Sequence, residues 1–134
     1  MTLEEQINQV LAELLPGHLG IRIEKASTEE VVGSLAVEEQ LCTYGGILHG
    51  GSVMALADTL GGVGAFLNLP PGTRTSTVES KTNFVRAAKI GTKVTATSRL
   101  VHKGRTLVLW QTEVRDPEGN LLALVSQSQM VVPD

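Results

Sequence analysis

Two residues in the middle of the chain could do chemistry together: His49, which precedes a pair of glycines, and Asp58, nine residues further on. Asp58 is the only formally charged residue between Glu39 and Arg74, and His49 is the only imidazole in that interval. A lone carboxylate in an apolar segment is costly unless it is paired, protonated or functional. Asp58 is therefore the first candidate for a general base or a nucleophile.

Gly50 and Gly51 stand where a helix over residues 50–67 is expected to begin. The first turn of a helix offers unpaired N–H groups and about half a positive charge, which can stabilise the oxygen of a carbonyl group under attack. Glycines leave that approach open because they have no side chain. Three structural alternatives remain: the glycines only let a strand pack closely, Asp58 caps a local kink, and His49 is structural.

The surrounding sequence predicts an α+β fold, with the central helix wrapped by a curved antiparallel sheet of six strands. Thr2 and Glu5 form a capping box at the start of an amphipathic helix over residues 1–17, which Pro16-Gly17 ends. Strands are expected at 21–24, 31–37, 74–86, 92–102, 106–115 and 121–132. Turns at 89–91, 103–105 and 116–120 predict that the last four strands form a meander. The helix is apolar nearly all round, so we expect it to be buried, with its glycines allowing another backbone to come close.

Length, composition and charge limit the possible functions. The 134 residues predict one domain, and no run approaches the ~20 apolar residues of a membrane span. An acidic N-terminus without a basic leader region favours a cytoplasmic protein. Few aromatic residues make nucleic acid a poor partner, and a single cysteine with no zinc or P-loop motif implies no metal or cofactor. Residues 74–115 hold nine of the eleven basic residues, which indicates an anion site or simply a solvated strand face.

The order of these elements and three local patterns resemble the hotdog-fold thioesterases. The closest subgroup is similar to the HGG-type thioesterases of the phenylacetate pathway and of 4-hydroxybenzoyl-CoA. The patterns are His49-Gly50-Gly51 with Asp58, the segment 84–91, and the segment 102–106. The resemblance covers roughly residues 15–132. It implies an acyl-CoA thioesterase, with two alternatives: a dehydratase or hydratase acting on acyl thioesters, or a non-catalytic acyl-CoA binding module.

The resemblance also assigns roles to particular residues. Asp58 becomes the catalytic carboxylate, as nucleophile or general base, and the Gly50 N–H polarises the thioester carbonyl. Thr77 helps to hold the carboxylate or a water, and His49 orients the loop or contacts the acyl oxygen. Thr43 stands six residues before the histidine, where relatives often carry Asn or Gln, which puts the role of that position in doubt.

The resemblance also implies that the chain binds coenzyme A and assembles into a homodimer. CoA carries three phosphate groups, and we expect Arg86, Lys103 and Arg105 to contact them, the last two around Gly104. His49 and Asp58 lie about half a helical turn and roughly 13 Å apart on one helix, too far to serve one carbonyl. An antiparallel homodimer would combine them in shared sites, and the family often pairs dimers into tetramers. The acyl group stays open, with Met54 and Phe66 among the residues expected to line its pocket.

Overall fold

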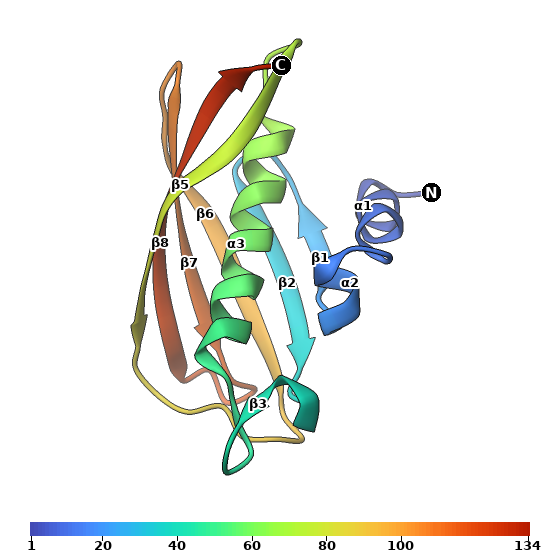
Figure 1. Ribbon diagram of the computed structural model, residues 1–134, viewed down its shortest axis with the longest axis vertical. Helices are drawn as coiled ribbons and strands as arrows, with labels where there is room; N and C mark the ends of the chain where they lie inside the picture. Colours follow the sequence, from blue (N-terminus) through green and yellow to red (C-terminus); the bar gives the residue numbers. More distant parts are fainter.

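The computed structural model describes residues 1–134 and consists of a curved antiparallel sheet that holds one long helix in its concave face (Figure 1). The helices are α1 (Leu3–Leu11), α2 (Leu15–Leu19), the 3-10 turn η1 (Glu39–Leu41) and α3 (Gly50–Leu67). The sheet strands are β1 (Arg22–Ala26), β2 (Glu30–Ala36), β5 (Thr73–Phe84), β6 (Lys93–Lys103), β7 (Leu107–Arg115) and β8 (Leu121–Pro133). A small separate hairpin joins β3 (Cys42–Thr43) to β4 (Ile47–Leu48). The predicted fold, six strands around a central helix, is confirmed.

The strand order is β1-β2-β6-β7-β8-β5, so the predicted meander of the last four strands is wrong at its first connection. β5 pairs with β8 at one edge, whereas β6 lies between β2 and β7. The segment after β5 crosses the end of the sheet instead of turning back. It is held on the way because the Val85 N–H donates to Leu122 O at 2.8 Å and the Gly91 N–H donates to Val37 O at 2.9 Å. A turn sequence does not distinguish such a crossover from a hairpin.

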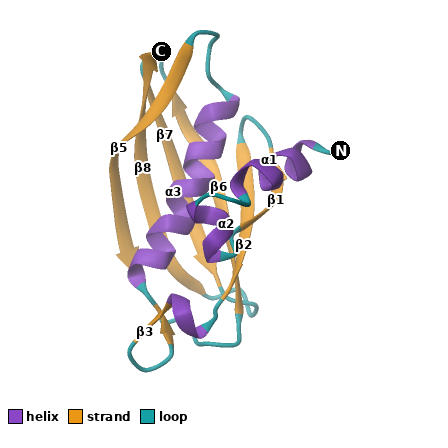
Figure 2. Ribbon diagram, turned by 45° about the vertical axis from the view of Figure 1, so that its right-hand side comes forward, coloured by secondary structure: helices purple, strands orange, loops and turns teal.

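The N-terminal helix is shorter than predicted. The capping box of Thr2 and Glu5 is present, but α1 ends at Leu11, and Pro16 lies in the first turn of the second helix α2. Proline is tolerated there because the first N–H groups of a helix have no partner in any case. The predicted single helix over residues 1–17 is therefore two helices that meet at an angle beside β1 (Figure 2).

Helix α3 has the predicted bounds but is not buried on all sides. Its inner face is fully covered, with Leu56 and Leu60 at 0% exposure, while Met54, Asp58 and Phe66 are exposed. By length and composition alone α3 could cross a membrane, yet its apolar residues pack against the sheet as those of a core helix do. The exposed side of α3 in the single chain leaves Asp58 accessible.

The glycines of α3 make room for side chains, not for the backbone that the sequence led us to expect. A Cβ at Gly61 would lie 2.3 Å from Gln127 Oε1, and one at Gly64 would lie 2.5 Å from the ring of Trp110. Both distances are shorter than any tolerated contact, so these two positions require glycine while Gln127 and Trp110 keep their places. Both side chains come from the concave face of the sheet, on β8 and β7.

Candidate active site

The N-terminus of α3 presents one free backbone donor. His49 is the N-cap residue, and its Nδ1 accepts a hydrogen bond from the Gly51 N–H at 2.7 Å. That bond requires Nδ1 to be unprotonated, so the neutral imidazole carries its proton on Nε2. The loop is fixed because the His49 N–H and the Ser52 hydroxyl both donate to Leu41 O. The Gly50 N–H has no hydrogen-bond partner in the chain.

Gly50 borders an apolar cleft of about 370 Å³ at the end of the sheet. The opposite wall is formed by the end of β5, with Phe84, and by the segment that follows it, with Arg86. The Phe84 ring lies so close that a Cβ at Gly50 would be 3.1 Å from its Cζ. A larger residue at position 50 would therefore crowd both the cleft and the free N–H.

Asp58 lies in a directed network of hydrogen bonds. Thr77 Oγ1 donates to Asp58 Oδ1 at 2.8 Å, and Gln127 Nε2 donates to the same oxygen at 3.0 Å. Thr77 in turn accepts from Gln129 Nε2 at 2.9 Å, and Gln129 Oε1 accepts from Thr75 Oγ1 at 2.9 Å. Since the Thr77 oxygen accepts from Gln129, its own proton is directed toward Asp58. Oδ2 of Asp58 has no protein partner and is the oxygen free to react.

Sequence reasoning missed Gln127 and Gln129. They are 3% and 1% exposed and belong to β8, which lies more than sixty residues after Asp58 in the sequence. One signal could have found them: they continue the inward-facing positions of a strand whose earlier inward residue is Val125. Two glutamines in positions that normally hold apolar residues need polar partners. Thr77, which the family resemblance singled out, does contact Asp58, at a point where a bulge shifts the β5 register.

The single chain does not bring the candidate catalytic residues into one site. Asp58 borders a groove between α1 and α3, whereas Gly50 borders the separate cleft at the end of the sheet. Thr43 lies in β3, opposite Ile47 of the small hairpin, and no hydrogen bond joins it to Asp58. The chain therefore holds a carboxylate in one cleft and an unpaired backbone N–H in another.

The basic residues predicted to bind CoA are also divided. Arg86 follows β5 beside the Gly50 cleft, while Lys103, Gly104 and Arg105 form the β6–β7 hairpin at the opposite end of the sheet (Figure 1). The eleven residues of β6 separate these ends by about 33 Å. A single chain therefore does not bring Arg86 together with Lys103 and Arg105. Gly104 serves the hairpin itself, because its N–H donates to Leu107 O at 2.8 Å.

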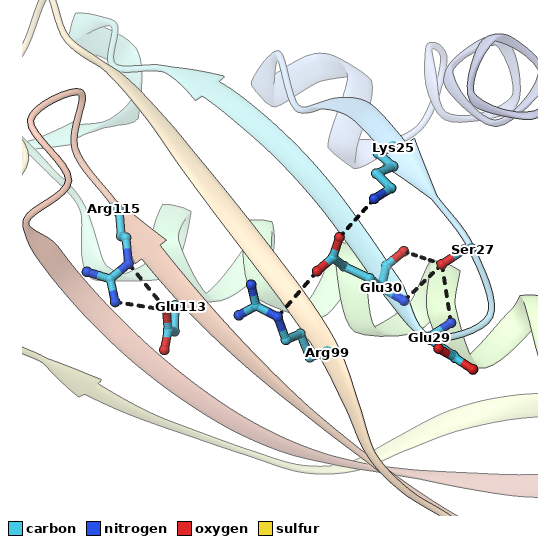
Figure 3. Close-up of polar contacts among 7 residues, drawn as sticks. All are labelled: Lys25, Ser27, Glu29, Glu30, Arg99, Glu113 and Arg115. Carbon is cyan, nitrogen blue, oxygen red and sulfur yellow. Dashed lines mark hydrogen bonds and ion pairs between the residues drawn. The ribbon is translucent and has the colours of Figure 1, made fainter.

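Part of the basic excess is neutralised on the outer face of the sheet. Glu30 pairs with Lys25 at 3.2 Å and with Arg99 at 3.3 Å, and Arg115 pairs with Glu113 at 2.9 Å (Figure 3). For Arg99 and Arg115, these contacts agree with the alternative that the basic residues of 74–115 lie on a solvated strand face. Arg86 makes no ion pair, but a carboxylate lies near it. The Asn120 side chain holds the pKa of Asp116 below its usual range, and the charge of Arg86 acts in the same direction.

A long helix wrapped by a curved antiparallel sheet, with a carboxylate on the helix and a free N–H at its start, defines a hotdog-fold protein equipped for carbonyl chemistry. Residues 45–123 match the family model described as "Thioesterase superfamily". The chain belongs to this superfamily and is a thioester hydrolase.

Individual relatives agree with this assignment. A Deinococcus radiodurans protein named "Putative esterase" is 38% identical over 117 residues, which cover 87% of this chain and 72% of that protein. The 1,4-dihydroxy-2-naphthoyl-CoA hydrolase of Escherichia coli is 28% identical over 87% of this chain and 85% of its own. A solved thioesterase from Haemophilus influenzae superposes with a TM-score of 0.92 at 28% identity, covering 99% of this chain and 92% of that one.

Proposed function

We propose that this thioester hydrolase cleaves acyl-CoA to a free acid and CoA in a site shared by two copies of the chain. Asp58 of one copy acts on the thioester carbon, and the Gly50 N–H of the other binds the carbonyl oxygen. The observation that carries the proposal is the division described above: a carboxylate with one free oxygen and an unpaired helix N–H, in separate clefts of one chain. The E. coli relative, by its name, acts on an aromatic acyl-CoA.

The free Oδ2 of Asp58 permits two routes. As a general base it takes a proton from water, the new hydroxide attacks the carbonyl carbon, and the C–S bond breaks as Asp58 returns the proton to the leaving thiolate. As a nucleophile it forms a mixed anhydride with release of CoA, and water then hydrolyses the anhydride. Both routes need the oxyanion donor, which is typically worth ~3–4 kcal/mol. We propose that His49 holds the loop that supplies it and that Thr43 helps to place the water.

The pairing of two copies has support in the exposed parts of the sheet and helix. β5 is a twelve-residue edge strand without one buried residue, and its outer edge is unpaired. Native proteins rarely leave a long edge strand open, because it invites pairing with another chain. The exposed Met54 and Asp58 of α3 are further surface that a second copy would face. Pairing two dimers into a tetramer is the further step that we propose.

A two-fold axis between antiparallel copies would also reunite the basic residues. The end of one sheet that carries Arg86 would face the end of the other that carries Lys103 and Arg105. We propose that these residues contact the phosphates of CoA from two chains. The protein is proposed to act in the cytoplasm, which fractionation of the native host would test.

The test is a hydrolysis screen with acyl-CoA and aroyl-CoA substrates, with the released thiol measured. We expect turnover that Asp58→Asn abolishes. A protein that binds acyl-CoA without releasing thiol would contradict the proposal, and so would one that hydrates an enoyl-CoA while leaving the thioester intact.

A further inference from the structure

An apolar groove of about 520 Å³ runs between α1 and α3, and Asp58 stands in its wall. On the α1 side it is lined by Leu3, Ile7 and Val10, and on the α3 side by Val63 and Phe66. Small-molecule pockets of this size are lined mainly by apolar side chains with a few polar groups that fix orientation. Phe66 and Val10 are 67% and 69% exposed in the chain. Leaving two apolar side chains on facing helices in contact with water is unfavourable in free energy.

We infer that this groove binds the acyl group of the thioester and that α1 sets the acyl length. The inference rests on the proposed function, because it takes Asp58 as the group that meets the thioester carbon. From that carbon the CoA arm leaves in one direction and the acyl group in the other. The groove is the apolar recess that borders Asp58, so the acyl group enters it when the carbon lies against Oδ2.

The lining also defines the chemical class of the acyl group. Asp58 is the only charged residue of the groove, and no lysine, arginine or histidine lines it. An acyl group ending in a carboxylate would have no cation to pair with and would meet the charge of Asp58. From Asp58 to Phe66 the helix rises about 12 Å, which matches an extended chain of about ten carbons. The groove thus fits an uncharged, medium-length apolar acyl group.

The α1 wall is fixed in position by the edge of the sheet. Asn8 makes two hydrogen bonds with the backbone of Ile23, accepting from its N–H and donating to its carbonyl oxygen, each at 2.8 Å. Glu4 accepts from the Ala26 N–H at 2.9 Å. Because these three bonds hold α1 to β1, the width of the groove is defined before any acyl group enters.

The experiment compares acetyl-CoA, octanoyl-CoA and succinyl-CoA with the wild-type protein and with Val10→Trp, which fills the groove. We expect the ratio of kcat/KM for octanoyl-CoA over acetyl-CoA to fall at least about tenfold in Val10→Trp. Leu15→Trp is the matched control, because Leu15 is 64% exposed and lies outside the groove. It should leave the ratio unchanged. Phe66→Ala should shift the preference toward longer acyl chains, because it lengthens the groove. Light scattering checks that this variant keeps the oligomeric state of the wild type.

The outcomes separate this inference from the proposed function. An equal loss on both substrates in Val10→Trp, or no loss, would overturn the acyl assignment while hydrolysis itself stands. Butyryl-CoA, which matches succinyl-CoA in length but has no terminal carboxylate, is added as the control for charge. Equal turnover of these two substrates would overturn the uncharged class. If no acyl-CoA is hydrolysed, the proposed function fails, and titration with a non-hydrolysable decanoyl-CoA thioether still tests the groove. If Val10→Trp does not weaken binding of the thioether, the acyl group does not lie in the groove. The groove would then be covered by something else, such as a second copy of the chain.

Discussion

Asp58 is held by one of its two carboxylate oxygens. Thr77 and Gln127 both donate to Oδ1, and hydrogen bonds to an ionised acceptor are about twice as strong as neutral ones. The carboxylate is therefore fixed in orientation while Oδ2 stays available. In the proposed mechanism, Oδ1 positions the carboxylate and Oδ2 carries out the reaction.

Asp58→Asn should lower kcat at least ~100-fold, because an amide cannot act as a general base or a nucleophile here. The Asn carbonyl oxygen can still accept from Thr77 and Gln127, so the fold should be kept. Thiol release gives kcat, and circular dichroism checks the fold. Near-full turnover by a folded variant would mean that Asp58 is structural.

Gln127→Leu should lower kcat about tenfold with little change in KM, since Asp58 loses one of its two orienting donors. Stability should hold or rise, because the buried Gln127 Oε1 has no partner, and replacing such a group by an apolar one is often neutral. Urea unfolding and kinetics on the same variant provide both readouts.

Gln111→Leu is the control for this change, because Gln111 is an exposed glutamine on β7. It should alter neither kcat nor the free energy of unfolding. A Gln127→Leu protein that unfolds more easily but turns over normally would assign Gln127 a purely structural role.

At the scale of elements, α1 depends on a charged contact. The Ala26 N–H that donates to Glu4 holds the pKa of this carboxyl below its ordinary value of 4.5. A lowered pKa means that the contact stabilises the folded chain fully above the ordinary pKa and loses its effect as the pH falls through the folded value.

We therefore expect α1 to loosen from β1 as the pH falls below the ordinary value of 4.5 and through the lower folded value, with faster amide hydrogen exchange at Ala26. In Glu4→Gln the exchange should be faster already at neutral pH and should depend less on acidification. Identical pH profiles for the two proteins would exclude Glu4 as the cause.

The β6–β7 hairpin supports a second prediction about an element. Arg105→Ala should raise KM for acyl-CoA but not for an acyl-pantetheine that lacks the nucleotide, because only the former carries the phosphates. Arg115→Ala is a suitable control, since Arg115 is already paired with Glu113. Equal effects of Arg105→Ala on KM for both substrates would contradict the proposed contact between Arg105 and the CoA phosphates.

Local patterns predicted the elements well, because periodicity and turn residues act over short distances. The helix bounds at Gly50 and Leu67 and the capping box at Thr2 came from such signals. Turn residues also predicted the β6–β7 and β7–β8 hairpins, but they could not predict the strand beside which β5 lies. The crossover after Phe84 and the contact of Asp58 with Gln127 depend on which strand ends up beside which, and only the assembled sheet decides that. The resemblance to a family supplied Thr77 but not the two glutamines, whose polarity had no local explanation.

At the scale of the whole molecule, the proposed function gives each chain two incomplete sites. A mixture of Asp58→Asn and Gly50→Val, refolded together, should recover activity to as much as about a quarter of wild type with random pairing. Half of the dimers are then mixed, and each mixed dimer keeps one site with an intact Asp58 and an intact Gly50. The valine acts by crowding Phe84 and the free N–H.

Each variant refolded alone is the control and should stay inactive. Mixed dimers are verified by mass spectrometry of the native complex. Mixed dimers without activity would mean that each chain completes its own site.

The close approach of Gln127 to Gly61 also restricts the order in which the two positions can change during evolution. With Gln127 in place, a Cβ at position 61 would lie 2.3 Å from its amide oxygen, so replacing Gly61 first forces the Gln127 side chain to move from its place beside Asp58. A lineage that first exchanges Gln127 for a smaller residue is free to put alanine at position 61, which strengthens the helix by roughly 0.5–1 kcal/mol. Once that alanine is present, a returning glutamine could not take the same position beside Asp58. The contact therefore links the residue at position 61 to whether Gln127 can support Asp58.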